Sequence, residues 1–219
     1  MSTRKCYIFA PLVFISVGTA SMWRKALACL SSIVLGAVAV PPIDSPSDPG
    51  QSVSADDYAI FVAATSDLFA KNKIEKVIFL DHTSLGFPPG MAAMTQFGGK
   101  AQELLREVPK DAKDAFDLRN KSPLMLDSSK FGLPFQVTLL TAGDAEKSVK
   151  AGWKQFHKRY QKSAGITLLS LPGINAERDH ALQYVGNSCD SLCGEGWLLL
   201  LVKENGQWKV LRKMVIWVS

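Results

Sequence analysis

Histidine and cysteine are scarce in this chain, which has three histidines and four cysteines among 219 residues. The histidines lie far apart, and none belongs to an H-E-x-x-H pair or a comparable metal-binding spacing. The chain also lacks a Walker A loop and a G-x-G-x-x-G turn, and no G-x-S-x-G elbow surrounds Ser170. We therefore predict no metal site and no cofactor.

Clustered positive charge is also missing from most of the chain. The formal net charge is +5, but four basic residues precede Pro41 (Arg4, Lys5, Arg24 and Lys25) and no acidic residue does. Beyond them, 21 basic residues face 20 acidic ones, a net charge of +1. Nucleic-acid-binding domains need clustered basic residues to neutralise phosphates, so nucleic acid is not an expected partner.

Two uncharged apolar runs occupy residues 6–23 and 26–40, and each follows a basic pair. Both resemble the start of a secretory signal peptide, and basic pairs prefer the cytoplasmic side of a membrane. Both rules are satisfied if translation starts at Met22 and an A-x-A site at residues 37–39 is cleaved.

If Met1 is the start, the alternatives are cleavage near residues 18–20 or retention of the segment as a membrane anchor. Every alternative predicts an exported protein, periplasmic or secreted. Membrane contact is expected only through this segment, if it is not cleaved.

Residues 41–53 follow as a Pro- and Ser-rich stretch, with four prolines before Gly50. This composition cannot form a core and predicts a tether. The chain therefore divides into a targeting segment over 1–40, a linker over 41–53 and a single folded domain over 54–219.

The first half of this domain shows helical and extended patterns in turn. Ser54 and Asp57 fit a capping box, which predicts a helix over about 55–70. Further helices are expected over 100–108 and 110–119, and strands over 74–80 and 131–141.

The clearest helix is expected over 146–162, because four apolar residues share one stripe: Val149, Trp153, Phe156 and Tyr160. Trp153 is expected to bury this stripe against a sheet.

The last 55 residues have the pattern of an antiparallel meander. Four strands are expected, over 166–171, 180–186, 197–202 and 209–218, and Asn205-Gly206 predicts a hairpin turn. Alternation places Leu182 and Tyr184 on one face of the second strand, opposite Ala181 and Val185. One face of the last strand is expected to carry Trp208, Val210, Met214 and Ile216.

A meander of about four strands, with a long helix packed on it, predicts an α+β fold. N-terminal helices and one or two further strands complete the expected fold.

A motif pattern runs through this region: W-x2-F-x3-Y from Trp153, A-L-x-Y-V from Ala181, L-C-G-x-G from Leu192, N-G-x-W-x-V from Asn205, and W-V-S at the end. It resembles a family of uncharacterised exported bacterial proteins over about the last 70 residues. Gln161 stands where that family has proline. The family has no assigned activity, so the resemblance implies fold and export only.

Cys189 and Cys193 are separated by three residues. In an exported protein such a pair favours a disulfide that closes a turn. The alternative is copper or redox chemistry, but Cys-x-x-x-Cys copper-delivery sites lie between a strand and a helix. Here strands flank both cysteines, and a soft-metal site needs a third ligand.

Four residues are weak catalytic candidates: Asp81, His82, Ser170 and His180. Asp81 and His82 follow a strand, where catalytic groups often lie, but Asp81 and Thr83 are also typical of side chains that bond to turn backbone. Ser170 ends a strand, and His180 begins one.

We expect an exported, non-catalytic binding or interaction domain whose partner is an unknown protein or cell-envelope component. The alternative is a periplasmic hydrolase that uses Asp81 or His82 in a cleft between helix and sheet. A pocket joining Asp81, His82 and His180 would favour the enzyme.

Overall fold

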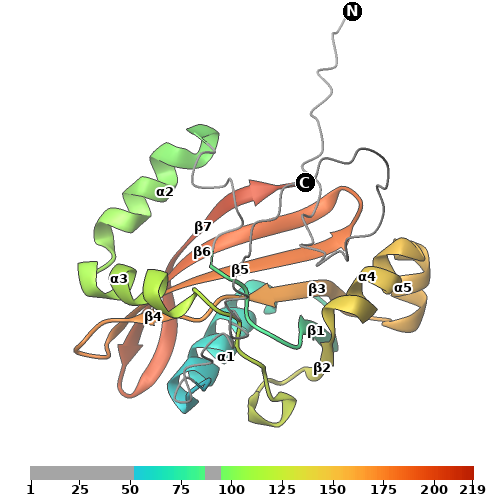
Figure 1. Ribbon diagram of the computed structural model, residues 1–219, viewed down its shortest axis with the longest axis horizontal. Helices are drawn as coiled ribbons and strands as arrows, with labels where there is room; N and C mark the ends of the chain where they lie inside the picture. The colour runs from blue at the N-terminus through green and yellow to red at the C-terminus, as the bar shows by residue number, and fades with distance from the viewer. Residues whose placement is uncertain (1–51, 87–94) are drawn as a thin grey trace, which may run out of the picture. The chain divides into compact units, whose positions relative to one another are not determined.

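The structure is a computed structural model that describes residues 52–86 and 95–219 (Figure 1). The expected targeting segment, its Met22 start and its cleavage site lie outside the described residues, as does nearly all of the linker. The described residues belong to one compact unit. No helix in this part of the chain has both the length and the apolar composition of a membrane span.

A seven-stranded mixed sheet forms the centre of the fold, in the order β2-β1-β3-β5-β6-β7, with β4 paired to β5. β1 is parallel to both β2 and β3, whereas β3, β5, β6 and β7 form an antiparallel meander. The α+β class and the C-terminal antiparallel strands are therefore confirmed. The strands are β1 (Lys76–Leu80), β2 (Gln136–Leu140), β3 (Ser163–Leu169), β4 (Gly173–Ile174), β5 (His180–Asp190), β6 (Cys193–Glu204) and β7 (Gln207–Val218).

Helices cover both faces of the sheet (Figure 1). They are α1 (Ala55–Phe69), α2 (Thr95–Glu107), α3 (Lys110–Arg119), α4 (Ala142–Lys150) and α5 (Trp153–Arg159), with a short 3-10 helix at Ser128–Lys130. α1 packs on one face. On the opposite face, α2 and α3 pack against the meander, and α4 and α5 pack against β1 and β2.

The alternation along β5 accounts for these two layers. Ala181 and Val185 belong to the apolar cluster under α1, whereas Leu182 and Tyr184 belong to the cluster under α2 and α3. Successive side chains of a strand point to opposite faces, so a strand covered on both sides is apolar throughout. The predicted faces of this strand are confirmed.

The single helix expected over 146–162 is wrong. α4 ends at Lys150 and α5 begins at Trp153, because Gly152 between them adopts a left-handed φ of 95°. Glycine reaches this region without steric cost, so the chain turns there and starts a second short helix. Phe156 and Tyr160 still pack in one cluster, which explains why their spacing suggested one helix.

The face expected for β7 is also wrong in part. Leu200 pairs with Arg212 and Leu201 with Val210, so Leu211 is an extra residue that forms a bulge. A bulge moves every following side chain to the opposite face. Trp208 and Val210 therefore pack under α1, whereas Met214 and Ile216 pack under α2 and α3.

The N-terminus of α1 is tied to the C-terminus of α3 through a buried ion pair. The predicted capping box is confirmed, because Ser54 and Asp57 exchange side-chain and backbone hydrogen bonds. The fully buried Asp57 also accepts two hydrogen bonds from Arg119, each of 2.8 Å. Arg119 donates a third to the Pro172 carbonyl, at 2.6 Å.

Trp153 is only partly buried, at the rim of the cluster that contains Phe156. Phe156 is 1% exposed, and its ring centroid lies 5.2 Å from that of Trp153. Phe156→Ala should lower the free energy of unfolding by about 3–5 kcal/mol, as large aromatic truncations in cores do. Trp153→Ala should cost clearly less, because its side chain removes less apolar area from water.

Urea unfolding followed by far-ultraviolet circular dichroism measures both variants without relying on tryptophan fluorescence. Equal losses would mean that Trp153 carries a core role, as the sequence pattern suggested.

Candidate functional site

Asp81, His82 and Thr83 lie at the carboxyl end of β1, where they hold a neighbouring loop. His82 Nδ1 lies 2.6 Å from Asp81 Oδ1. The buried Thr83 donates its backbone N–H to the Leu124 carbonyl, and its hydroxyl accepts from the Leu124 N–H at 3.0 Å. Thr83 thus makes the expected kind of side-chain-to-backbone bond, but to a segment 41 residues away and not to its own turn.

Ser170 and His180 each have a local partner. Ser170 is fully buried, and its hydroxyl accepts a hydrogen bond of 2.9 Å from the Tyr184 N–H. A nucleophile must reach its substrate, so this hydroxyl is poorly placed for attack. His180 Nδ1 lies 2.7 Å from Asp179 Oδ1, and this hydrogen bond, together with one from Asn175, lowers the pKa of the Asp179 carboxyl.

The structure does not bring all four candidates together. Ser84, just after His82, forms a bridge with Ser170, so Asp81, His82 and Ser170 share one end of the sheet. His180, however, is four residues from Tyr184 along β5, or about 13 Å at the rise of a strand.

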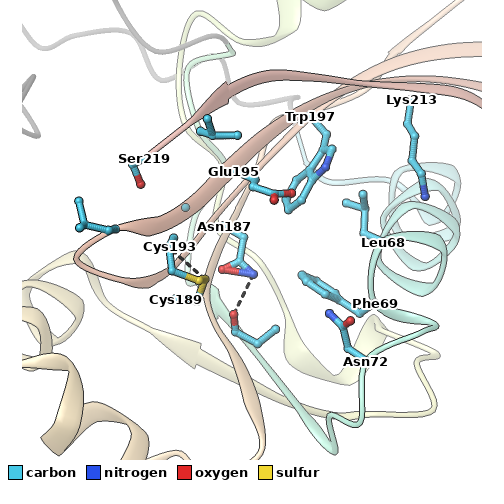
Figure 2. Close-up of a pocket in the computed structure, with 14 residues that line it drawn as sticks. Leu68, Phe69, Asn72, Asn187, Cys189, Cys193, Glu195, Trp197, Lys213 and Ser219 are labelled. Carbon is cyan, nitrogen blue, oxygen red and sulfur yellow. Dashed lines mark hydrogen bonds between the residues drawn. A yellow bond between two sulfur atoms is a disulfide. The ribbon is translucent and has the colours of Figure 1, made fainter. Parts of the chain in front are cut away.

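A pocket of about 520 Å³ opens at the other end of the strands, beside the turn between β5 and β6 (Figure 2). Its walls come from the end of α1, the start of β3, the β5–β6 turn and the end of β7. Ala164 at the start of β3 lines it, whereas the Ser84–Ser170 bridge lies at the end of β3. Among its lining residues are Leu68, Phe69, Asn187, Glu195, Trp197 and Lys213.

A disulfide between Cys189 and Cys193 closes the turn that forms one wall. Their Cα atoms are 5.1 Å apart, so the predicted proximity is confirmed. The imidazole of His157 on α5 lies 2.7 Å from the Cys189 carbonyl, which gives the turn a second contact. The turn is therefore held both by a covalent bond and by the neighbouring helix.

Polar residues of three neighbouring strands lie in register beside the pocket, and two of them, Asn187 and Glu195, line it. Thr167 on β3 pairs with Asn187 on β5, which in turn pairs with Glu195 on β6. Asn187 is 5% exposed, and its amide nitrogen donates to the Ala164 carbonyl at 2.9 Å. Its Oδ1 and the hydroxyl of Thr167 are buried without a partner among the described residues.

Such buried polar atoms are rare in native proteins, and each calls for an explanation such as an unseen ligand or water. Neither Asn187 nor Glu195 is a site residue predicted from the sequence. Their one local signal is that they flank the cysteine pair.

Within residues 52–86 and 95–219, no three His, Cys, Asp or Glu side chains lie close enough together to hold a metal ion. Comparison of the chain with protein-family models, with curated proteins and with solved structures found no match in any of the three.

Thiol labelling of the native, unreduced protein should modify neither Cys189 nor Cys193, because both sulfurs are in the disulfide. Peptide mapping by mass spectrometry scores these two sites separately from Cys6 and Cys29. The same protein, reduced and denatured, is the positive control. Stoichiometric labelling of both sites before reduction would refute the disulfide.

Proposed function

We propose that this chain is an exported, non-catalytic binding domain and that its binding site is the pocket beside the β5–β6 turn. The observation that carries the proposal is the pocket itself, which the disulfide-closed turn and the end of α1 enclose, with Asn187, Glu195 and Trp197 among its lining residues. A pocket of about 520 Å³ is within the usual size for small-molecule sites.

Two further observations support the export part of the proposal. Disulfides persist mainly in oxidising compartments outside the cytoplasm, and Cys189 and Cys193 form one. The motif pattern of the last part of the chain also resembles exported bacterial proteins. The partner expected from the sequence was a protein or a cell-envelope component, and a group from either could enter this pocket.

A hydrolase that uses Asp81 or His82 is the second candidate, and one observation favours it. The contact of 2.6 Å between Asp81 Oδ1 and His82 Nδ1 orients the imidazole, as a carboxylate does in a catalytic triad. Against it, the pocket lies at the opposite end of β3, and the nearby Ser170 hydroxyl is buried and already bonded. The binding domain is therefore the conclusion that the geometry supports best.

Mass spectrometry of the chain recovered from the periplasm or the medium tests export. We expect an N-terminus near Val40, because the A-x-A site at residues 37–39 ends an apolar run. An exported product that still contains residues before Met22 would contradict the proposed start and cleavage site. A product found only in the cytoplasm, with Cys189 and Cys193 reduced, would contradict export itself.

A fragment set of positive, neutral and negative compounds, read by amide chemical shifts of the oxidised protein, tests binding. We expect the largest shifts at residues 187–197 and at the end of α1, because these segments line the pocket. Trp197→Phe should weaken the binding of the fragments that it contacts, whereas Trp153→Phe, outside the pocket, should not. Shifts confined to Asp81 and His82 would favour the hydrolase.

A further inference from the structure

A local excess of positive charge lies along α4 and α5, although the chain beyond Pro41 is close to neutral. From Lys147 to Lys162 the sequence has six Lys or Arg residues and no Asp or Glu. Lys147, Lys150 and Lys162 are each paired with a carboxylate. The other three are exposed, and no carboxylate of the described residues pairs with them: Lys154, Lys158 and Arg159.

The stability of the helix does not account for this charge. Lys158 and Arg159 are in the last turn of α5, where the negative end of the helix dipole favours them. Lys154, however, is the second residue of α5, and the first turn contains no acidic residue. The positive end of the dipole disfavours a cation there, so Lys154 costs the helix stability.

Lys154 and Lys158 lie on the face of α5 that meets the disulfide-closed turn. Residues three and four apart on a helix are neighbours, so both lysines share a face with His157. The His157 imidazole lies 2.7 Å from the Cys189 carbonyl of the turn. The partly exposed indole of Trp153 lies beside it, with ring centroids 5.9 Å apart. The two lysines, the indole and the turn therefore belong to one surface.

The turn itself carries an exposed leucine. Leu192, just before Cys193, is 75% exposed, more than any other large apolar side chain that the structure describes. Val218, which is 61% exposed, pairs with Glu195 beside the same turn. Single exposed leucines are common on protein surfaces. A leucine beside unpaired lysines and a tryptophan, however, has the composition of a surface that lies on a membrane.

The acidic groups at this end of the sheet do not cancel its positive charge. Asp190 in the turn and Glu195 just after it are exposed and make no ion pair within the described residues. Lys71 and Lys73 are exposed and unpaired in the same sense, and they flank Asn72, which lines the pocket with Leu192. Together with the three basic residues of α5, five cations oppose two carboxylates, a net charge of +3.

We propose that this end of the molecule docks on an anionic lipid surface. Leu192 and the indole of Trp153 enter the boundary between headgroups and acyl chains, while Lys154 and Lys158 lie among the lipid phosphates. A protein partner would need a broad surface of about 800 Å² on each side. Here the exposed apolar groups are a few protruding side chains, which suits lipid better than an acidic protein.

This inference goes beyond the proposed function and does not depend on the pocket as a binding site. The sequence predicts membrane contact only through residues 1–40, if they are not cleaved. The proposed surface is a second contact, made by the folded domain itself.

Flotation of the oxidised chain, as recovered after export, tests this with vesicles of phosphatidylcholine alone and of phosphatidylcholine mixed with phosphatidylglycerol. We expect binding to the mixed vesicles and much weaker binding to phosphatidylcholine. Added salt should weaken the binding, because it screens exposed charges. Equal binding to both kinds of vesicle, or none to either, would overturn the proposal.

A double variant, Lys154→Gln with Lys158→Gln, tests the position of the surface. It should weaken binding to the mixed vesicles by about 25-fold, because each lysine near an anionic surface contributes about fivefold. Lys121→Gln with Lys130→Gln is the matched control, since it removes two exposed lysines from the segment that Thr83 holds at the carboxyl end of β1. It should change binding little. Equal losses in the two double variants would mean that only net charge matters, which would overturn the docking surface.

Leu192→Gln tests the apolar part. It should weaken binding by about tenfold, because a leucine side chain no longer leaves water. Leu118→Gln, at a leucine on α3 that is 62% exposed, is the control and should have no effect. Thermal midpoints establish that each variant is folded, and all variants share one N-terminus, so any contribution of that segment cancels. If poly-glutamate binds as tightly as the vesicles and Leu192→Gln has no effect, the partner is an acidic protein and the lipid proposal is overturned.

Discussion

The carboxylate of Asp57 is fully buried, and a buried charge is tolerated only where other groups supply an opposite charge and hydrogen bonds. Ser54 and Arg119 supply them, and Arg119 also binds the carbonyl of Pro172, which follows β3. Removing one partner from such a pair leaves an uncompensated charge, which costs about 3–5 kcal/mol. Because α1 and α3 cover opposite faces of the sheet, this one cluster joins both layers around the end of β3. The close packing of β4 against α3 also requires glycine at position 173, where a Cβ atom would lie 2.1 Å from the Ala112 carbonyl of α3.

The contacts of Asp57 with Ser54 and Arg119 fix the N-terminus of α1 and thereby the position of its far end. The helix has 15 residues, so its last turn lies about 22 Å from its capped N-terminus. That last turn contributes Leu68 and Phe69 to the pocket, and the contact between Asp67 and Lys213 holds it to β7. The opposite wall is the turn that the disulfide closes. The pocket therefore lies between two walls that are each held by fixed contacts, which favours a preformed site over one that assembles around its ligand.

Features that depend on neighbouring residues could be predicted from the sequence, whereas those that depend on distant pairing could not. The capping box at Ser54 and the turn at Asn205, whose φ is 51°, follow from local backbone chemistry. Despite the helix break at Gly152, three residues of the expected stripe (Trp153, Phe156 and Tyr160) pack in one cluster, in which α4 is represented by Ala145 and not by Val149. The bulge at Leu211 arises from how β7 pairs with β6, which no alternation pattern within β7 reveals. The parallel pairing of β1 with β2 and β3 joins segments far apart in the chain, so it could not be predicted from the pattern of any one segment.

The candidate site was even harder to predict from the sequence, because strand register determines which side chains lie opposite each other there. Asn187 and Glu195 are eight residues apart and look like ordinary polar residues beside a turn. They face each other because the neighbouring residues Ser188 and Gly194 are also paired. Between Ser188 and the turn, Cys189 is an extra residue of β5 and forms a bulge. A shift of one residue would move Glu195 to the other face of the sheet and leave Asn187 without its neighbouring carboxylate. The disulfide joins this bulged cysteine to Cys193, so the bond that closes the turn also resists the shift. The disulfide therefore helps to fix the register of the strands that line the pocket, in addition to any effect on stability.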